Sequence, residues 1–97
     1  MLEWRSAMNL LIVDDEYLVV EEVVTVTDWE LLGITEIYSA TNAVSAVRIL
    51  NEKKIDIMIC DIEMPQTDGL ELSKKAKENF PDLEIVMLTS HAEFNYV

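Results

Sequence analysis

Short apolar runs alternate along the chain with longer stretches in which apolar residues recur at helical spacing. The apolar runs predict strands over residues 9–13, 36–39, 55–60 and 83–88. The periodic stretches predict helices over residues 16–27, 42–52 and 70–79. Asn42 is a suitable N-cap for the second helix, and Pro81 is expected to end the third. Because strands alternate with helices, the order predicts right-handed βαβ crossovers and a parallel sheet, which is an α/β fold.

The predicted strands LLIV, IDIMIC and LEIVML carry apolar residues at consecutive positions. A strand with one solvated face alternates apolar and polar residues, so continuous apolar runs are typical of strands that helices cover on both faces. The sequence therefore predicts a sheet with helices on each side.

Length, charge and cysteine content narrow the classes of function. The 97 residues are enough for one domain with a single core, and no apolar run approaches the roughly 18 residues of a membrane span. The net charge of −12 argues against binding to nucleic acid or anionic membranes, because phosphate contacts need clustered cations. The single cysteine, Cys60, excludes an internal disulfide and suits a reducing cytoplasm. Met8 can serve as a second start, so residues 1–7 are interpreted as an N-terminal extension without signal-peptide character and residues 8–97 as the domain.

Polar side chains follow three of the predicted strands. Asp14 and Asp15 follow the first strand, Asp61 follows the third, and Thr89 follows the fourth. In an open parallel sheet the carboxyl ends of the strands share one edge, where ligands bind, so these residues are expected to meet there. Clustered carboxylates repel one another, and a hard cation that prefers oxygen ligands, Mg²⁺, would relieve the repulsion. One oxygen of Asp61 would remain able to act as a nucleophile.

Each of these residues also has an ordinary structural interpretation. A single Asp or Thr after a strand is commonly a helix N-cap or a turn residue. The stretch IEMPQTDG after Asp61 reads as a turn-rich loop between a strand and a helix, in which Gly69 suits a tight turn or a close helix approach. Agreement among three strand ends is what favours a functional site.

The stretches LLIVDDE, CDIEMPQTDG and IVMLTSHAEF resemble the receiver domain of two-component response regulators, over residues 8–97. The wider runs TDWELLGI and HAEFNYV are similar to receivers that precede AraC-type helix-turn-helix output domains. The resemblance implies a flavodoxin-like doubly wound parallel sheet, with strand order 2-1-3-4 in these residues and without a fifth strand and its helix.

The resemblance also implies roles for particular residues. Asp61 would accept a phosphoryl group from the phosphohistidine of a histidine kinase. Asp15 would bind Mg²⁺ directly, Asp14 would bind it through water, and the backbone carbonyl of Glu63 would supply a further ligand. Thr89 would hydrogen-bond the bound phosphoryl oxygen.

One feature departs from the family pattern. Receivers carry a Lys at the end of a fifth strand, and neither that strand nor the helix after it is found in these residues. Lys74, Lys75 and Lys77 are predicted to lie on the third helix and are not expected to replace it. We therefore expect a receiver shortened at its C-terminal end, in which the strand over 83–88 is an uncovered edge. Such an edge predicts dimerisation or strand exchange through residues 83–88, or else low stability.

Three functions fit these observations. The first is a cytoplasmic phosphoacceptor that signals to an output domain, with a transcriptional role expected to lie in that domain and no metabolic activity. The second is a receiver-like interaction or dimerisation module that is not phosphorylated. The third is a phosphohydrolase with an Asp nucleophile, but such enzymes usually place a second Asp two residues later, where this chain has Glu63. The first interpretation accounts for most of the pattern.

Overall fold

The computed structural model describes residues 8–64 and 67–88, with residues 63, 64, 67 and 68 described through their backbone alone. The predicted extension over residues 1–7 and the predicted phosphoryl contact Thr89 lie outside the described residues. The fold below concerns the described part of the chain.

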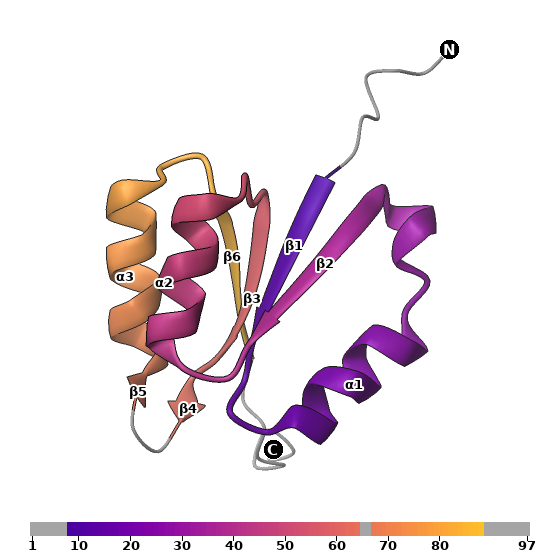
Figure 1. Cartoon of the computed structure of the whole chain (residues 1–97), viewed down its shortest axis with the longest axis horizontal. Coiled ribbons are helices and arrows are strands. Elements are labelled where there is room, and N and C mark those ends of the chain that lie inside the picture. Colours follow the sequence, from indigo (N-terminus) through magenta and orange to yellow (C-terminus); the bar gives the residue numbers. More distant parts are fainter. Residues whose placement is uncertain (1–7, 65–66, 89–97) are drawn as a thin grey trace, which may run out of the picture.

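A parallel sheet of four strands forms the centre of the molecule, in the order β2-β1-β3-β6 (Figure 1). Its strands are β1 (Met8–Val13), β2 (Ile34–Ala40), β3 (Ile57–Asp61) and β6 (Glu84–Leu88). All three pairings are parallel. The predicted flavodoxin-like α/β fold and its strand order 2-1-3-4 are confirmed.

Helices connect the strands as the crossovers require. They are α1 (Tyr17–Val26), α2 (Ala43–Glu52) and α3 (Gly69–Asn79). Asn42 caps α2 as predicted: its side chain accepts a hydrogen bond of 2.8 Å from the backbone N–H of Ser45. The third helix ends at Asn79, two residues before Pro81, and it begins one residue earlier than predicted, at Gly69.

Two short elements were not predicted. A 3-10 helix, η2 (Trp29–Leu32), precedes β2; the Asp28 carboxylate accepts from the backbone N–H of Leu31, and Gly33 ends the helix with a φ of 85°. A two-stranded antiparallel hairpin, β4 (Glu63–Met64) with β5 (Thr67–Asp68), occupies part of the stretch predicted as a turn-rich loop. Elements this short have no periodicity for a sequence pattern to reveal.

The alternation of side chains along the strands divides the core into two halves, one on each face of the sheet. Leu11, Val13, Met58 and Cys60 face α2 and α3, whereas Leu10 and Ile12 face α1. Figure 1 shows α2 and α3 together beside β3 and β6, with α1 beside β2. The prediction of helices on each side of the sheet is confirmed for β1.

The outer strand β6 departs from that prediction. Ile85 and Met87 pack against the core on the α2 and α3 side, but Val86 and Leu88, which alternate with them, keep 46% and 39% of their surface exposed. Among the described residues β6 pairs with β3 alone, so it is an edge strand of the sheet. Its continuous apolar sequence therefore does not reflect burial on both faces.

Candidate functional site

The carboxyl ends of β1 and β3 meet at the edge of the sheet that lies lowest in Figure 1. In the parallel register of these strands, Val13 is the partner of Cys60. Asp14 and Asp61, which follow these partners, therefore lie side by side at the carboxyl ends of the two strands. The backbone N–H of Asp14 also donates to the carbonyl of Ala40, at the end of β2, over 3.1 Å.

The structure brings together the three Asp residues singled out in the sequence. Each of Asp14, Asp15 and Asp61 offers a carboxylate oxygen, and these oxygens lie within 4.8 Å of one another. Only 4% of Asp14 and 2% of Asp61 is exposed, whereas Asp15 is half-buried. The cluster is therefore a partly desolvated site with one side reachable from solvent.

The concentration of negative charge changes the ionisation of Asp14. Burial is the main cause that raises the pKa of its carboxyl above the ordinary value of 3.8, and the negative charges of Asp61, Asp15 and Glu16 add to the rise. The backbone N–H of Glu16, which donates to Asp14 Oδ1 over 2.9 Å, acts in the opposite direction. The pKa of Asp14 is raised because repulsion and burial outweigh this hydrogen bond. A cation bound at the cluster would reverse that balance.

The donor set fits Mg²⁺ rather than a softer metal. All three groups are carboxylates, and hard oxygen ligands with room for water suit Mg²⁺. Glu63, predicted to supply a backbone carbonyl, lies in β4 two residues after Asp61, and its backbone pairs with that of Asp68. Thr89 lies outside the described residues, but Leu88, which precedes it, is the register partner of Asp61.

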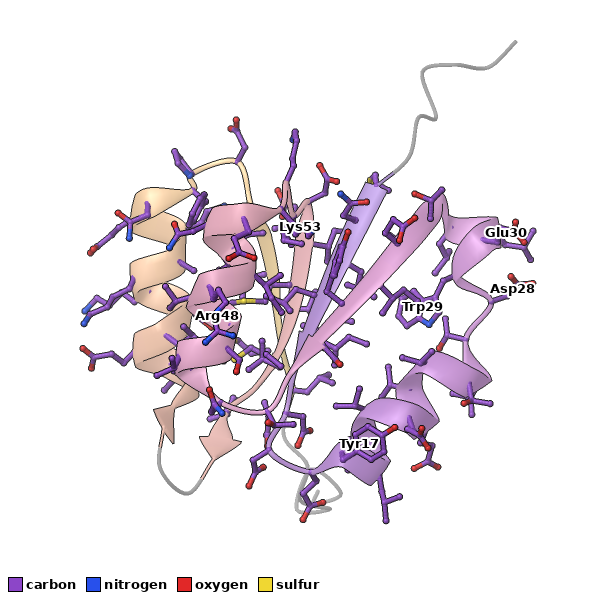
Figure 2. All side chains as sticks on the ribbon, in the orientation of Figure 1. Tyr17, Asp28, Trp29, Glu30, Arg48 and Lys53 are labelled. Carbon is purple, nitrogen blue, oxygen red and sulfur yellow. The ribbon has the colours of Figure 1, made fainter. Side chains whose placement is uncertain are left out.

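Lysines of α3 are engaged away from this edge. Lys77 Nζ donates to the carbonyl of Leu83 over 2.6 Å, and Lys75 Nζ lies 3.9 Å from a carboxylate oxygen of Glu71. Lys53, which follows α2, is also far from the acidic site. It lies at the opposite edge of the sheet from Tyr17, the first residue of α1, which is beside that site (Figure 2). Lys75 and Lys77 thus contact groups on α3 itself and at the residue before β6.

Backbone contacts that the sequence does not reveal hold Asp61 in place. The N–H of Ile62 donates to the carbonyl of Leu88 over 2.8 Å, which ties the end of β3 to β6. The thiol of Cys60 lies 3.5 Å from the carbonyl oxygen of Asp61 and 3.9 Å from that of Gly69. The contact with the Asp61 carbonyl is local in the sequence, whereas the contact with the Gly69 carbonyl depends on how α3 packs against β3.

Comparison with known proteins shows the family of the chain. The model of the response regulator receiver domain family matches residues 10–97. The chain belongs to this family. The receiver is 34% identical over 88 residues to the transcriptional regulatory protein YesN of Bacillus subtilis, covering 91% of this chain and 24% of YesN. The chain thus spans about a quarter of the length of that relative.

Solved structures also resemble the receiver. A two-component transcriptional regulator AraC from Clostridium phytofermentans is 26% identical with a TM-score of 0.82, covering 93% of this chain and 73% of that one. A CheY-like receiver domain from Methanospirillum hungatei is 26% identical with a TM-score of 0.77, covering 90% of this chain and 67% of that one. The predicted similarity to receivers of AraC-type regulators is confirmed.

Membership of the receiver family indicates which ligand and which partner are typical of such a site. This is a receiver domain of a two-component response regulator, and receivers typically use Mg²⁺ at an acidic pocket and interact with histidine kinases. Among the described residues, Asp14, Asp15 and Asp61 form a cluster of carboxylates that could hold a metal ion. Among the described helices, none is long and apolar enough to cross a membrane.

Proposed function

We propose that this receiver accepts a phosphoryl group on Asp61 from the phosphohistidine of a histidine kinase. The observation that supports the proposal most strongly is the meeting of Asp14, Asp15 and Asp61 at one strand edge, with their carboxylate oxygens within 4.8 Å of one another. Asp61 is the most buried of the three and ends the central strand β3. Rigid placement at a strand end suits a residue that must attack in line.

The reaction needs little from the protein beyond position and charge balance. A carboxylate oxygen of Asp61 forms a bond to phosphorus while the bond between phosphorus and the imidazole nitrogen of the kinase breaks. When bound, Mg²⁺ supplies positive charge against the phosphoryl oxygens. Asp15, Asp14 through water, Asp61 and the carbonyl of Glu63 would hold it, and Thr89 would hydrogen-bond the phosphoryl group.

Phosphorylation would then act as a signal. The longer relatives include transcriptional regulators, so we infer that the receiver works in the cytoplasm and reports to a transcriptional output domain. Its chemistry would be limited to gaining and losing its own phosphoryl group, without turnover of a metabolite. The net charge of −12 agrees with a receiver that does not itself contact nucleic acid or an anionic membrane.

A second candidate function is an interaction module that is not phosphorylated and that associates with another copy of itself. The edge strand β6 favours it, because Val86 and Leu88 are exposed and β6 has one strand partner among the described residues. Unpaired apolar edges pair readily with other chains.

Intact-protein mass spectrometry distinguishes the candidates. The receiver is incubated with acetyl phosphate, with and without Mg²⁺, as the wild type, Asp61→Asn and Asp82→Asn. Asp82 is an exposed acid before β6, at the opposite edge of the sheet, and serves as the matched control. A Mg²⁺-dependent gain of one phosphoryl group in the wild type and in Asp82→Asn, but not in Asp61→Asn, supports the phosphoacceptor.

The other outcomes contradict it. A wild type that binds Mg²⁺ but gains no phosphoryl group favours the interaction module. Steady turnover of a phosphomonoester with Mg²⁺ would instead indicate the phosphohydrolase considered from the sequence.

A further inference from the structure

We propose that Gly69 is a positioning residue for Asp61: its bare Cα fixes the Asp61–Ile62 peptide and, through it, the carboxylate of Asp61. The structural part of this inference stands on geometry alone, and only its chemical consequence rests on the proposed function. Gly69 is buried and is the first residue of α3. It is eight residues beyond Asp61 in the sequence but lies against it in the fold.

The contact leaves no room for a side chain. A Cβ added to Gly69 would overlap the carbonyl oxygen of Asp61 and would lie 3.1 Å from both the carbonyl carbon of Asp61 and the Cα of Ile62. All three atoms belong to the backbone, so no side-chain rotation can clear them. Gly33 is the one described glycine with a positive φ, so Gly69 is needed for close approach and not for an unusual backbone conformation.

Neither the Asp61–Ile62 peptide nor helix α3 can move away from the contact easily. The Asp61–Ile62 peptide is held from the side of β6 by the hydrogen bond from the N–H of Ile62 to the carbonyl of Leu88. The helix is held by Leu72 and Ala76, which are buried in the core that α2 shares. Because cores are close-packed, a methyl group at Gly69 must displace one of the two. The helix is held along its length by buried side chains, so the peptide is the part expected to move, and its movement would turn the Asp61 side chain.

The same displacement would reach the predicted metal ligands. Asp61 is one member of the carboxylate cluster, and Glu63 follows Ile62 directly along the chain. Groups that orient metal ligands without touching the metal typically change affinity by about 10–100-fold when altered. Gly69→Ala should therefore weaken Mg²⁺ binding by about tenfold or more, together with the rate of phosphorylation at a fixed Mg²⁺ concentration.

Gly33→Ala is the matched control. Gly33 has a φ of 85°, so an alanine there is strained, yet among the described residues its Cβ would meet only Met8, at an ordinary 3.6 Å. Gly33 caps η2 before β2 and lies outside the acidic site. Gly33→Ala therefore strains the backbone without placing any atom against Asp61. Both variants are compared in trimethylamine N-oxide, which favours folded chains, so that lost stability does not hide the result.

The test has two independent measurements. Amide hydrogen exchange follows the N–H of Ile62 against that of Leu11 in β1, and calorimetric titration with MgCl₂ follows metal affinity. The proposal expects Gly69→Ala to speed exchange at Ile62 relative to Leu11 and to weaken Mg²⁺ binding by about tenfold or more, while Gly33→Ala leaves the exchange ratio and the Mg²⁺ affinity unchanged. Equal acceleration at Ile62 and Leu11, or unchanged Mg²⁺ affinity in Gly69→Ala, would overturn it. If the wild type gains no phosphoryl group from acetyl phosphate, the proposed function fails, and these two measurements still decide the role of Gly69.

Discussion

Asp14 and Asp61 lie side by side at the carboxyl ends of adjacent parallel strands, because the residues before them, Val13 and Cys60, are register partners. Both side chains are nearly completely buried, and their carboxylate oxygens lie within 4.8 Å of each other. Burial and the neighbouring negative charges together raise the pKa of Asp14. The receiver therefore folds with an electrostatic cost at this edge, and that cost makes the site selective for cations.

Replacing Asp14 with Asn should stabilise the receiver in the absence of Mg²⁺. Asn keeps an oxygen that can accept from the N–H of Glu16, loses the charge, and gains a donor toward the neighbouring carboxylates. We expect the free energy of unfolding at pH 7 to rise by up to about 1 kcal/mol in urea titrations with EDTA. A decrease in stability at pH 7 would contradict the proposed repulsion.

The pH dependence of that difference follows from the direction of the pKa shift. The folded-state pKa of Asp14 lies above 3.8, so between the two values the folded state binds more protons than the unfolded state. Stability from this group thus falls as pH rises through that window, and the cost is fully present above the folded-state pKa. The advantage of Asp14→Asn should shrink as pH falls and vanish below 3.8, which urea titrations across the acid range would measure.

Magnesium should stabilise the folded receiver. A ligand that binds only the folded state at ten times its Kd adds about 1.4 kcal/mol, which raises the thermal midpoint of a domain this size by about 5–10 °C. Asp15→Asn should lose most of this rise, because it removes the cluster's half-buried ligand. Differential scanning calorimetry at constant ionic strength measures the midpoint. Asp82→Asn is the control, and an equal loss of the rise in that variant would indicate general charge screening instead of a site.

Much of this edge could be predicted from the sequence because parallel strands bring their carboxyl ends together. Asp14, Asp15 and Asp61 follow continuous apolar runs, and that pattern alone indicates that they meet. The burial of Asp14 and Asp61 could not be predicted in the same way, since it depends on how the rest of the chain packs around the strand ends. The contact between Gly69 and the Asp61 carbonyl has the same origin: the sequence indicates a glycine suited to close approach but not the atom approached.

For the edge strand β6, the apolar sequence predicts more burial than the structure shows. The run LEIVML looks like a strand that is covered on both faces. The residue types alone do not reveal whether another element covers an apolar face. Ile85 and Met87 contact the core, and Val86 and Leu88 remain exposed, so coverage by other elements decides burial. The short η2 helix depends on Asp28 and Gly33 at its two ends, a signal too local for periodicity to detect.

A comparison of Leu11 with Leu18 tests which leucines belong to the core. Leu11 is completely buried between β1 and the α2–α3 layer, whereas Leu18 on α1 is 77% exposed. Leu11→Ala should lower the free energy of unfolding by about 2–5 kcal/mol, because it removes buried methyl groups and leaves a cavity. Leu18→Ala should stay within about 0.5 kcal/mol of the wild type. Urea unfolding followed by circular dichroism measures both, and similar losses in the two variants would contradict the assigned faces.

The β6 edge predicts association of the receiver with a second copy. Val86 and Leu88 line the exposed face of β6, and β3 is the only strand that pairs with it among the described residues. We expect the wild type to sediment faster as its concentration rises, or else to unfold at an unusually low temperature. Lysine on an edge strand disfavours pairing because its charge must stay hydrated.

Val86→Lys should therefore abolish the concentration dependence in analytical ultracentrifugation and leave a monomer. Val44→Lys is the matched control, because Val44 is an exposed valine on α2, away from the edge, and the same charge there should leave association unchanged. Loss of association in both variants would point to net charge as the cause instead of the edge. A wild type that stays monomeric at all concentrations, with a midpoint of about 45–65 °C typical of a mesophilic domain, would show that β6 is not used for self-association.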